Sequence, residues 1–335
     1  MTSYQKVEVR RPAWTTSAGV TLVELMVALA IGSFLIIGAV QVYNQSRQAY
    51  VVNESIARVQ ETAQFAMDTI EADLRMASNW GKNSRNDSIE GRSIPGDTDP
   101  LGLLPASATG CGADWVLDLE RPVTGSNNAY GLLCGATGTA QLNSDTVTGR
   151  RAHVDPVVPE NGRLQIQTTH IQGELFTDAA IPAGFDPDPD VSETHNLLVN
   201  SYYVAQSSQL IGGVPTLRRK SLTINAGAPD IADQEVAPGI ENLQVQFGVD
   251  VDRDNTIDRY VNPGASILDP GHADFIPGAR VMIARVWLVV RSIDREMGIV
   301  DNRSYEPGDV DLGVPNDDFR RIQVSKTILL RNTRT

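Results

Sequence analysis

A long apolar run near the N-terminus restricts what this chain can fold into more than any other feature. In residues 20–40 only Thr21, Glu24 and Ser33 are polar. About 20 mostly apolar residues are enough to cross the hydrocarbon core of a membrane as a helix. We therefore expect a transmembrane helix over residues 20–42. Its single acid needs an explanation, because a carboxylate inside a membrane usually has a functional partner.

The segment before this run is basic and has no apolar stretch. Lys6, Arg10 and Arg11 stand against one acid, Glu8. Positive charge beside an apolar span keeps that flank in the cytoplasm, so we expect the rest of the chain to be exported. An ordinary secretory signal is the alternative, but the sequence "IIGAVQVYNQ" after the run lacks the A-x-A pattern of its cleavage site.

Apolar residues continue beyond the membrane-length run at helical spacing. No proline or glycine occurs between Gly38 and Gly81, so nothing local ends the helix before residue 78. We expect residues 43–78 to be its amphipathic half, with one apolar stripe that packs on a folded head. The stripe consists of Val52, Ile56, Val59, Ala63, Ala66, Ile70, Leu74 and Ala77.

Residues 79–335 have the pattern of a β-rich head. In residues 241–250 apolar side chains alternate with Asn242, Gln244 and Gln246, which is typical of a half-buried strand. Apolar residues occupy both faces of 280–290, which predicts a central strand covered on both sides. Further strands are expected at 114–120, 162–169, 196–206, 216–225 and 321–330, with a turn at Gly212 and Gly213 joining two of them.

An acidic loop follows the 241–250 strand and has the spacing of a calcium loop. Calcium prefers six to eight hard oxygen ligands on a sharply turned loop, and carboxylates at alternate positions point toward a common centre. Asn255 suits the left-handed turn, although Val261 stands where a full EF-hand has glutamate. We expect a structural calcium ion within residues 250–258, with a plain polar hairpin as the alternative. The expected ligands are Asp250, Asp252, Asp254, Thr256 and Asp258.

The chain has two cysteines, Cys111 and Cys134, outside any zinc-ligand pattern. If the head lies outside the cytoplasm, they can form a disulfide.

Two function classes are disfavoured by the composition and motifs. A net charge of -13 argues against nucleic-acid binding, which depends on clustered basic residues. No GxSxG, HExxH, P-loop or GxGxxG motif is present, so we do not expect an enzyme. The four histidines are scattered and are expected on loops or the surface: His153, His170, His195 and His272.

The hexapeptide "GVTLVE" at Gly19–Glu24 resembles the processing site of type IV pilins and of the related pseudopilins of type II secretion. The resemblance implies that a prepilin peptidase removes a leader of residues 1–19, cutting between Gly19 and Val20, and methylates the new N-terminus. Glu24 then docks subunits by pairing with the N-terminal amine of a neighbour in the fibre. Taken alone, Glu24 could equally lie at the membrane interface, where its charge suits the start of a helix.

The segments "ENLQVQFGVDVDRDNTIDRYV", "ARVWLVVRS" and "DDFRRIQVSKTILLRN" resemble the PilW-type minor pilins. This implies an α+β, pilin-like fold: a long N-terminal helix, hydrophobic and then amphipathic, packed on a mainly antiparallel β-sheet head. It also implies a subunit anchored in the inner membrane with a periplasmic head, which later moves to the pilus tip at the cell surface.

The resemblance further implies a set of partners. The N-terminal helix would contact other minor pilins and the major pilin, and the inner-membrane assembly platform and a large tip adhesin would be further partners. The expected role is a tip complex that primes type IV pilus assembly. The alternatives are a J-type pseudopilin of type II secretion and a pilus-tip adhesin whose head binds a surface ligand.

Overall fold

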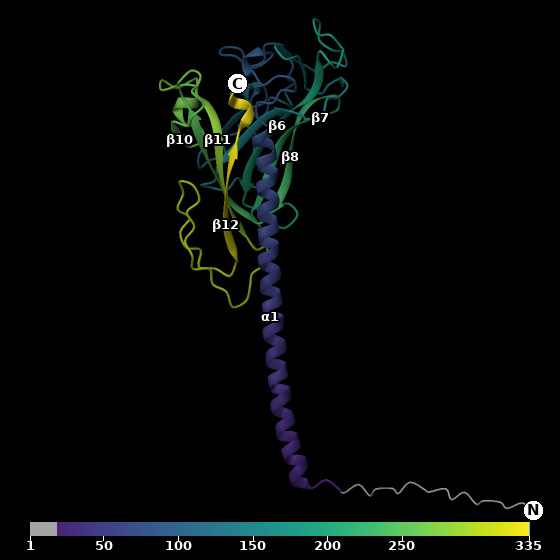
Figure 1. Ribbon diagram of the computed structural model, residues 1–335, viewed down its shortest axis with the longest axis vertical. Helices are drawn as coiled ribbons and strands as arrows, with labels where there is room; N and C mark the ends of the chain where they lie inside the picture. The colour runs from purple at the N-terminus through teal and green to yellow at the C-terminus, as the bar shows by residue number, and fades with distance from the viewer. Residues whose placement is uncertain (1–18, 335) are drawn as a thin grey trace, which may run out of the picture. The chain divides into compact units, whose positions relative to one another are not determined.

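The structure, a computed structural model, describes residues 19–334 (Figure 1). The basic flank at Lys6, Arg10 and Arg11 lies outside the described residues, as does all of the expected leader except Gly19. The chain divides into two compact units, Met1–Asn53 and Glu54–Thr335. Helix α1 (Leu22–Arg75) contributes residues to both units.

In the first unit the described residues are almost entirely helical, and their large apolar side chains are exposed. α1 is long and apolar enough to cross a membrane, judged by its length and composition. Exposed apolar side chains are stable only against lipid or against other apolar helices. The prediction of an uninterrupted apolar helix from this part of the sequence is therefore confirmed.

In the second unit one stripe of α1 is buried against the head. The predicted stripe is confirmed from Val59 onward, whereas Val52 and Ile56 remain partly exposed. Two of its members, Ala63 and Ala66, are small enough to let strands approach the helix backbone closely. The buried helical residues are Val59, Ala63, Ala66, Met67, Ile70, Asp73 and Leu74.

α1 ends at Arg75, three residues before the expected end at Ser78. Ser78 has a φ of 66°, a left-handed conformation that ends a helix. Its N–H donates to the carbonyl of Arg150 at 3.2 Å, so a strand takes the donor that another helical turn would have used.

The head contains two sheets. The larger has eight strands, and β7 (Thr216–Asn225) and β8 (Ala228–Pro238) extend it from β6. Every pair in it is antiparallel except β1 with β5. The remaining strands run in the order β1 (Ile89–Glu90), β5 (Gly173–Phe176), β4 (Gln165–Thr168), β6 (Glu193–Ala205), β3 (Thr146–Ala152) and β2 (Val123–Ser126).

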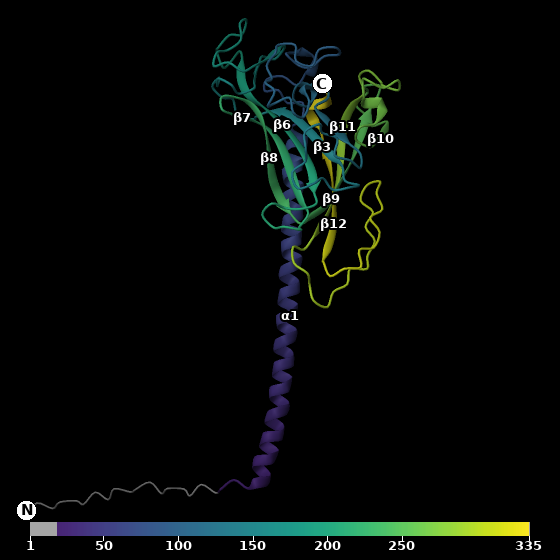
Figure 2. The same cartoon turned by 180° about the vertical axis from the view of Figure 1, so that it is seen from behind.

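The smaller sheet is antiparallel and has four strands. Figures 1 and 2 show it on one side of the helix, with β6, β7 and β8 on the other. Apolar side chains of both sheets and of α1 share one core. The strand order is β10 (Arg259–Val261), β9 (Ile240–Asp250), β11 (Arg280–Arg291) and β12 (Arg321–Leu329). Short 3-10 helices occur at Asn86–Ser88, Ser266–Leu268 and Arg331–Arg334.

Most of the expected strands are confirmed, including the hairpin of β6 and β7. The strand expected at 114–120 is wrong, because α2 (Ala113–Leu117) is a short helix there. Trp115, Val116 and Leu117 are all buried, so their burial does not alternate as it does in a half-buried strand.

Two expectations about polar residues are also wrong. His195 is buried in β6, where its Nδ1 lies 2.9 Å from the carbonyl of His153, rather than on a loop or the surface. β9 is not half-buried, because Asn242 and Gln244 are buried on the face opposite the helix. Both amides donate to the carbonyl of Asn143, so another chain segment covers that face.

A buried polar cluster joins α1 to the larger sheet. Asp73 Oδ1 accepts hydrogen bonds from Arg151 Nε at 3.0 Å and Nη2 at 2.9 Å. Its Oδ2 accepts from Asn200 Nδ2 at 2.7 Å and from the Tyr202 hydroxyl at 2.5 Å. Because Arg151 is in β3 and the other two are in β6, a single carboxylate fixes the helix against two neighbouring strands.

The Asp73 cluster predicts a large loss of stability when its cation is removed. Arg151→Met leaves a buried carboxylate without a counter-charge, which should lower the free energy of unfolding by about 3 kcal/mol. The midpoint of chemical denaturation of the detergent-solubilised chain measures this. Arg58→Met is the control, because the Arg58–Glu54 pair is exposed and should contribute less than about 0.5 kcal/mol. Equal losses in the two variants would contradict the role of the cluster.

Candidate functional site

Glu24 closes a hydrogen-bonded cap at the start of α1. Its Oε2 accepts hydrogen bonds from the backbone N–H and the hydroxyl of Thr21, both at 2.9 Å. The Thr21 hydroxyl oxygen in turn accepts the N–H of Glu24 at 3.3 Å. This is the capping box of the pattern Thr-x-x-Glu, with Thr21 as the N-cap. Sequence reasoning placed Glu24 near a helix start but missed this pairing, which the spacing of the two residues indicates.

The cap uses only part of the carboxylate. Within the described residues Oε1 of Glu24 accepts no hydrogen bond, and the side chain is exposed. Gly19 and Val20 are also exposed beside it. The local geometry therefore allows Glu24 to hold its own helix start and still offer an oxygen to a cation from outside the chain.

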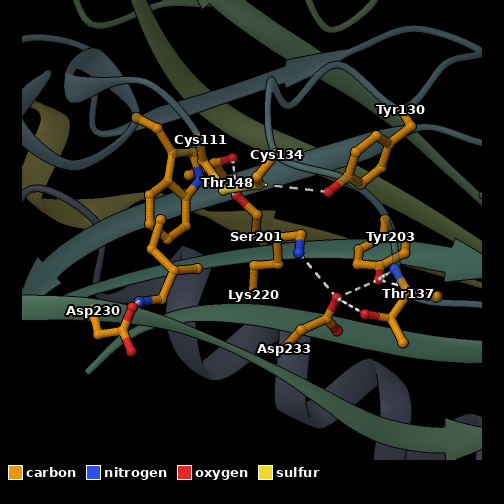
Figure 3. The surroundings of a disulfide bond; sticks show 12 residues. Cys111, Tyr130, Cys134, Thr137, Thr148, Ser201, Tyr203, Lys220, Asp230 and Asp233 are labelled. Carbon is orange, nitrogen blue, oxygen red and sulfur yellow. Dashed lines mark hydrogen bonds and ion pairs between the residues drawn. A yellow bond between two sulfur atoms is a disulfide. The ribbon is translucent and has the colours of Figure 1, made fainter. Parts of the chain in front are cut away.

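The predicted disulfide between Cys111 and Cys134 is present, with 4.3 Å between the Cα atoms (Figure 3). The hydroxyl of Tyr130 lies 3.7 Å from Sγ of Cys134. Next to Cys111, the indole N–H of Trp115 donates to Ser201 Oγ of β6 at 2.6 Å. The disulfide therefore closes a segment that contains α2 and β2, and Trp115 of this segment is bonded to β6 of the larger sheet.

Asp233 of β8 ties the chain just after this segment to the sheet. Its Oδ2 accepts hydrogen bonds from Thr137 Oγ1 at 2.7 Å, from Tyr203 at 2.8 Å and from Lys220 Nζ at 2.9 Å (Figure 3). Burial alone would raise the pKa of Asp233, but these donors, with Arg218, hold it below its usual value. Thr137 lies just beyond Cys134, so both ends of the disulfide segment are anchored.

The disulfide predicts a loss of stability on its removal. A double Cys111→Ser, Cys134→Ser variant should lose about 3 kcal/mol, because the open segment has more conformational freedom in the unfolded chain. Denaturation midpoints measured with and without a reducing agent test this. The reducing agent should destabilise the natural chain and leave the variant unchanged. If the reducing agent does not change the denaturation midpoint of the natural chain, the bridge contributes little to its stability.

The acidic loop brings together three of the five residues expected to bind calcium. Ligand atoms of Asp250, Asp252 and Asp254 all lie within 4.8 Å of one another. Asp258 is engaged elsewhere, since its Oδ2 accepts the N–H of Val251 at 2.7 Å.

The turn itself has the expected conformation. Asn255 has a φ of 69°, the left-handed conformation expected from the sequence. The N–H of Thr256 donates to Asp254 Oδ1 at 2.7 Å, so Thr256 stabilises the turn through its donor.

One carboxylate of the acidic loop already has a cationic partner. Arg280 Nη2 lies 3.0 Å from Asp250 Oδ2, and the two residues face each other across β9 and β11. Burial alone would raise the pKa of Asp250, but Arg280 and the N–H groups of Asn255 and Arg253 hold it below its usual value. Sequence reasoning missed Arg280 because its role depends on the register of two strands far apart in the chain.

Comparison with known proteins found a family model that matches each end of the chain. A family model described as prokaryotic N-terminal methylation motif matches residues 14–40. A second, described as Type IV Pilus-assembly protein W, matches residues 201–332, which contain β7–β12. The chain belongs to the type IV pilins, in the PilW-type group. As a member of this family it is a structural subunit that acts in pilus assembly, and not an enzyme.

Among solved structures, this pilin is similar to a type IV-like pilin from Thermus thermophilus. The identity is 15%, the match covers 64% of this chain and 85% of that chain, and the TM-score is 0.28. A search of curated proteins found no match.

The methylation motif and the apolar helix place this pilin among subunits anchored in the inner membrane. The family also accounts for the exposed apolar surface of residues 20–51, since pilins interact with other pilus components.

Proposed function

We propose that this PilW-type pilin primes type IV pilus assembly as one member of a complex of minor pilins at the fibre tip. The observation that supports this best is the start of α1, where an exposed carboxylate oxygen stands at the head of an exposed apolar helix. A helix of this kind is stable in lipid and, after extraction, in a bundle of like helices. The head would stand in the periplasm first and at the pilus tip after assembly.

The processing step defines the group that Glu24 would meet. Cleavage between Gly19 and Val20 creates a positively charged amine one residue before the N-cap Thr21. In a bundle of parallel helices, the amine of one subunit and Glu24 of the next would neutralise each other in an apolar environment. Such a pair sets the axial position of a subunit, as a single buried polar residue does in a coiled coil.

The partners follow from the same surface. The apolar half of α1 would contact the major pilin, the other minor pilins and the assembly platform in the inner membrane. The head, whose two sheets are held together by a shared core, would contact the neighbouring minor pilins and a large tip adhesin.

Substitutions at the capping box separate the two roles of Glu24. Glu24→Gln keeps the capping box, since glutamine serves in it as well, but it removes the charge. Thr21→Ala removes the cap hydroxyl but keeps the charge. We expect Glu24→Gln to insert in the membrane and to enter sheared pili at less than about a tenth of the normal level, as loss of a buried charge pair predicts. Thr21→Ala should enter them at close to the normal level.

The number of pili per cell tests the priming role in the same strains. A primer is needed once per fibre, so the Glu24→Gln strain should have fewer pili of ordinary length. Normal incorporation of Glu24→Gln combined with a defect in Thr21→Ala would show that Glu24 acts only as a helix cap. Normal pilus number with no incorporated subunit would contradict priming.

We also propose that the acidic loop holds a structural calcium ion. Asp250, Asp252 and Asp254 fit the ligand chemistry, because all three offer hard carboxylate oxygens on one turned loop. Arg280 already neutralises Asp250, so the exposed Asp252 and Asp254 would supply most of the attraction. Such a site suits the weak binding typical of extracellular modules, with Kd on the order of 0.1 to 1 mM.

Chelation tests the acidic loop. An ion in the loop should add about 3 °C to the fall in Tm that EGTA causes in the detergent-solubilised chain, since the ion stabilises only the folded loop. The fall in Tm should therefore be about 3 °C smaller in the double variant Asp252→Asn, Asp254→Asn than in the natural chain. An EGTA effect of the same size in the natural chain and in the double variant would leave the loop as a plain polar hairpin.

A further inference from the structure

A second group of oxygen atoms lies outside the acidic loop, around the buried carboxylate of Asp145. This residue precedes β3 and is 1% exposed. Its Oδ1 accepts the N–H of Asn128 at 2.7 Å, and its Oδ2 accepts the N–H of Val245 at 2.7 Å. The carboxylate is therefore held between the turn that follows β2 and the edge of β9.

A second carboxylate reaches the same turn. Asp309, in the segment between β11 and β12, accepts hydrogen bonds at Oδ2 from Asn127 Nδ2 at 3.1 Å and Asn262 Nδ2 at 2.5 Å. Because Asn127 and Asn128 are consecutive, Asp145 and Asp309 are both bound to one short turn. Burial of Asp145 raises its pKa to about 7, and the nearby charge of Asp309 contributes to the rise.

These two carboxylates have no cationic partner among residues 19–334, where neither forms an ion pair with a lysine, arginine or histidine. This distinguishes the group from Asp250, which is paired with Arg280, and from Asp73, which is paired with Arg151. A buried carboxylate with a second one nearby is unfavourable unless a positive charge compensates it.

Amide oxygens without a hydrogen-bond donor occur on the same turn and next to the segment that carries Asp309. In the described part of the chain, the buried side-chain amide oxygens without a hydrogen-bond donor are those of Asn127, Asn128 and Gln244. Gln244 is 0% exposed, and its side chain contacts Gly308, with Oε1 3.6 Å from where a Cβ on that glycine would stand. Gly308 directly precedes Asp309. Each such oxygen loses its water on folding and gains nothing in return unless a donor or a cation occupies the space.

We infer that this group binds a divalent metal ion, calcium, through the carboxylates of Asp145 and Asp309 and the amide oxygens of Asn127 and Asn128. Calcium accepts a mixture of carboxylate and amide oxygens from separate loops and tolerates irregular geometry. Gln244 borders the site from β9 and supplies a further oxygen directly or through water. The ion would fasten the segment that carries Asp309 to the junction of the two sheets.

The test measures calcium binding in a chain whose acidic loop has lost two of its expected calcium ligands. The background is full-length protein in detergent carrying Asp252→Asn and Asp254→Asn. Calcium chloride is titrated by calorimetry at pH 7.5, and Tm is measured with calcium and with EGTA. We expect calcium to raise the Tm of this background by about 5 °C, because the ion binds only the folded arrangement.

Three further substitutions in that background assign the site. Asp145→Asn should abolish the calcium response. Asp309→Asn, at an exposed position that does not endanger folding, should weaken binding about tenfold or more by removing one charged ligand. Asp178→Asn, an exposed acid after β5, should leave binding unchanged and controls for net charge.

Two results would overturn the inference. A background that shows no calcium response, with Asp145→Asn as stable as its parent or more so, would mean that Asp145 is a buried acid holding a proton. A response that persists in full in Asp309→Asn would place the ion elsewhere. Both results leave the assembly role untouched, because that role is read from Glu24 and from the number of pili.

Discussion

The attachment of the head to α1 depends on a carboxylate placed on the apolar stripe of a helix. Asp73 lies among Ile70, Leu74 and their buried neighbours, where an unpaired charge would be strongly unfavourable. Its bonds to Arg151, Asn200 and Tyr202 satisfy it only when β3 and β6 stand in one register against the helix. The apolar stripe alone would allow the helix to slide or rotate. The buried cluster removes that freedom and so determines where the head is held.

The two sheets pack on the same apolar stripe of α1, and each carries a different polar feature of the head. The larger sheet carries the disulfide segment, whose ends are secured by the bridge itself and by Asp233. The smaller sheet carries the acidic loop and packs β9 and β11 against α1. Acids gather where chain segments from different elements converge. Some of them, such as Asp250, are neutralised by an arginine of the chain, while Asp145 is not.

Sequence patterns predicted a helix or strand correctly where all the residues that determine it lie within one short segment. The stripe from Val59 to Leu74 and the alternation in β9 and β11 follow from spacing alone, so those elements could be predicted. The prediction of a strand at 114–120 was wrong because its short alternating pattern also fits one buried helical turn beside Cys111. The end of α1 was misplaced because Ser78 bonds to a strand residue, Arg150, that is remote in sequence.

The sequence by itself determined the membrane-length helix, its cap at Thr21 and Glu24, the strand periodicity and the pair of cysteines available for a bridge. Each of these is set by residues close together in the chain or by composition, so their physics is local. Only the tertiary structure decided which charges are compensated. Arg280 meets Asp250 through the register of β9 and β11, and Asp145 and Asp309 approach one turn although they are far apart in the sequence. The free energy of a buried charge depends on what surrounds it in space, and residue order does not contain that information until the strands have paired.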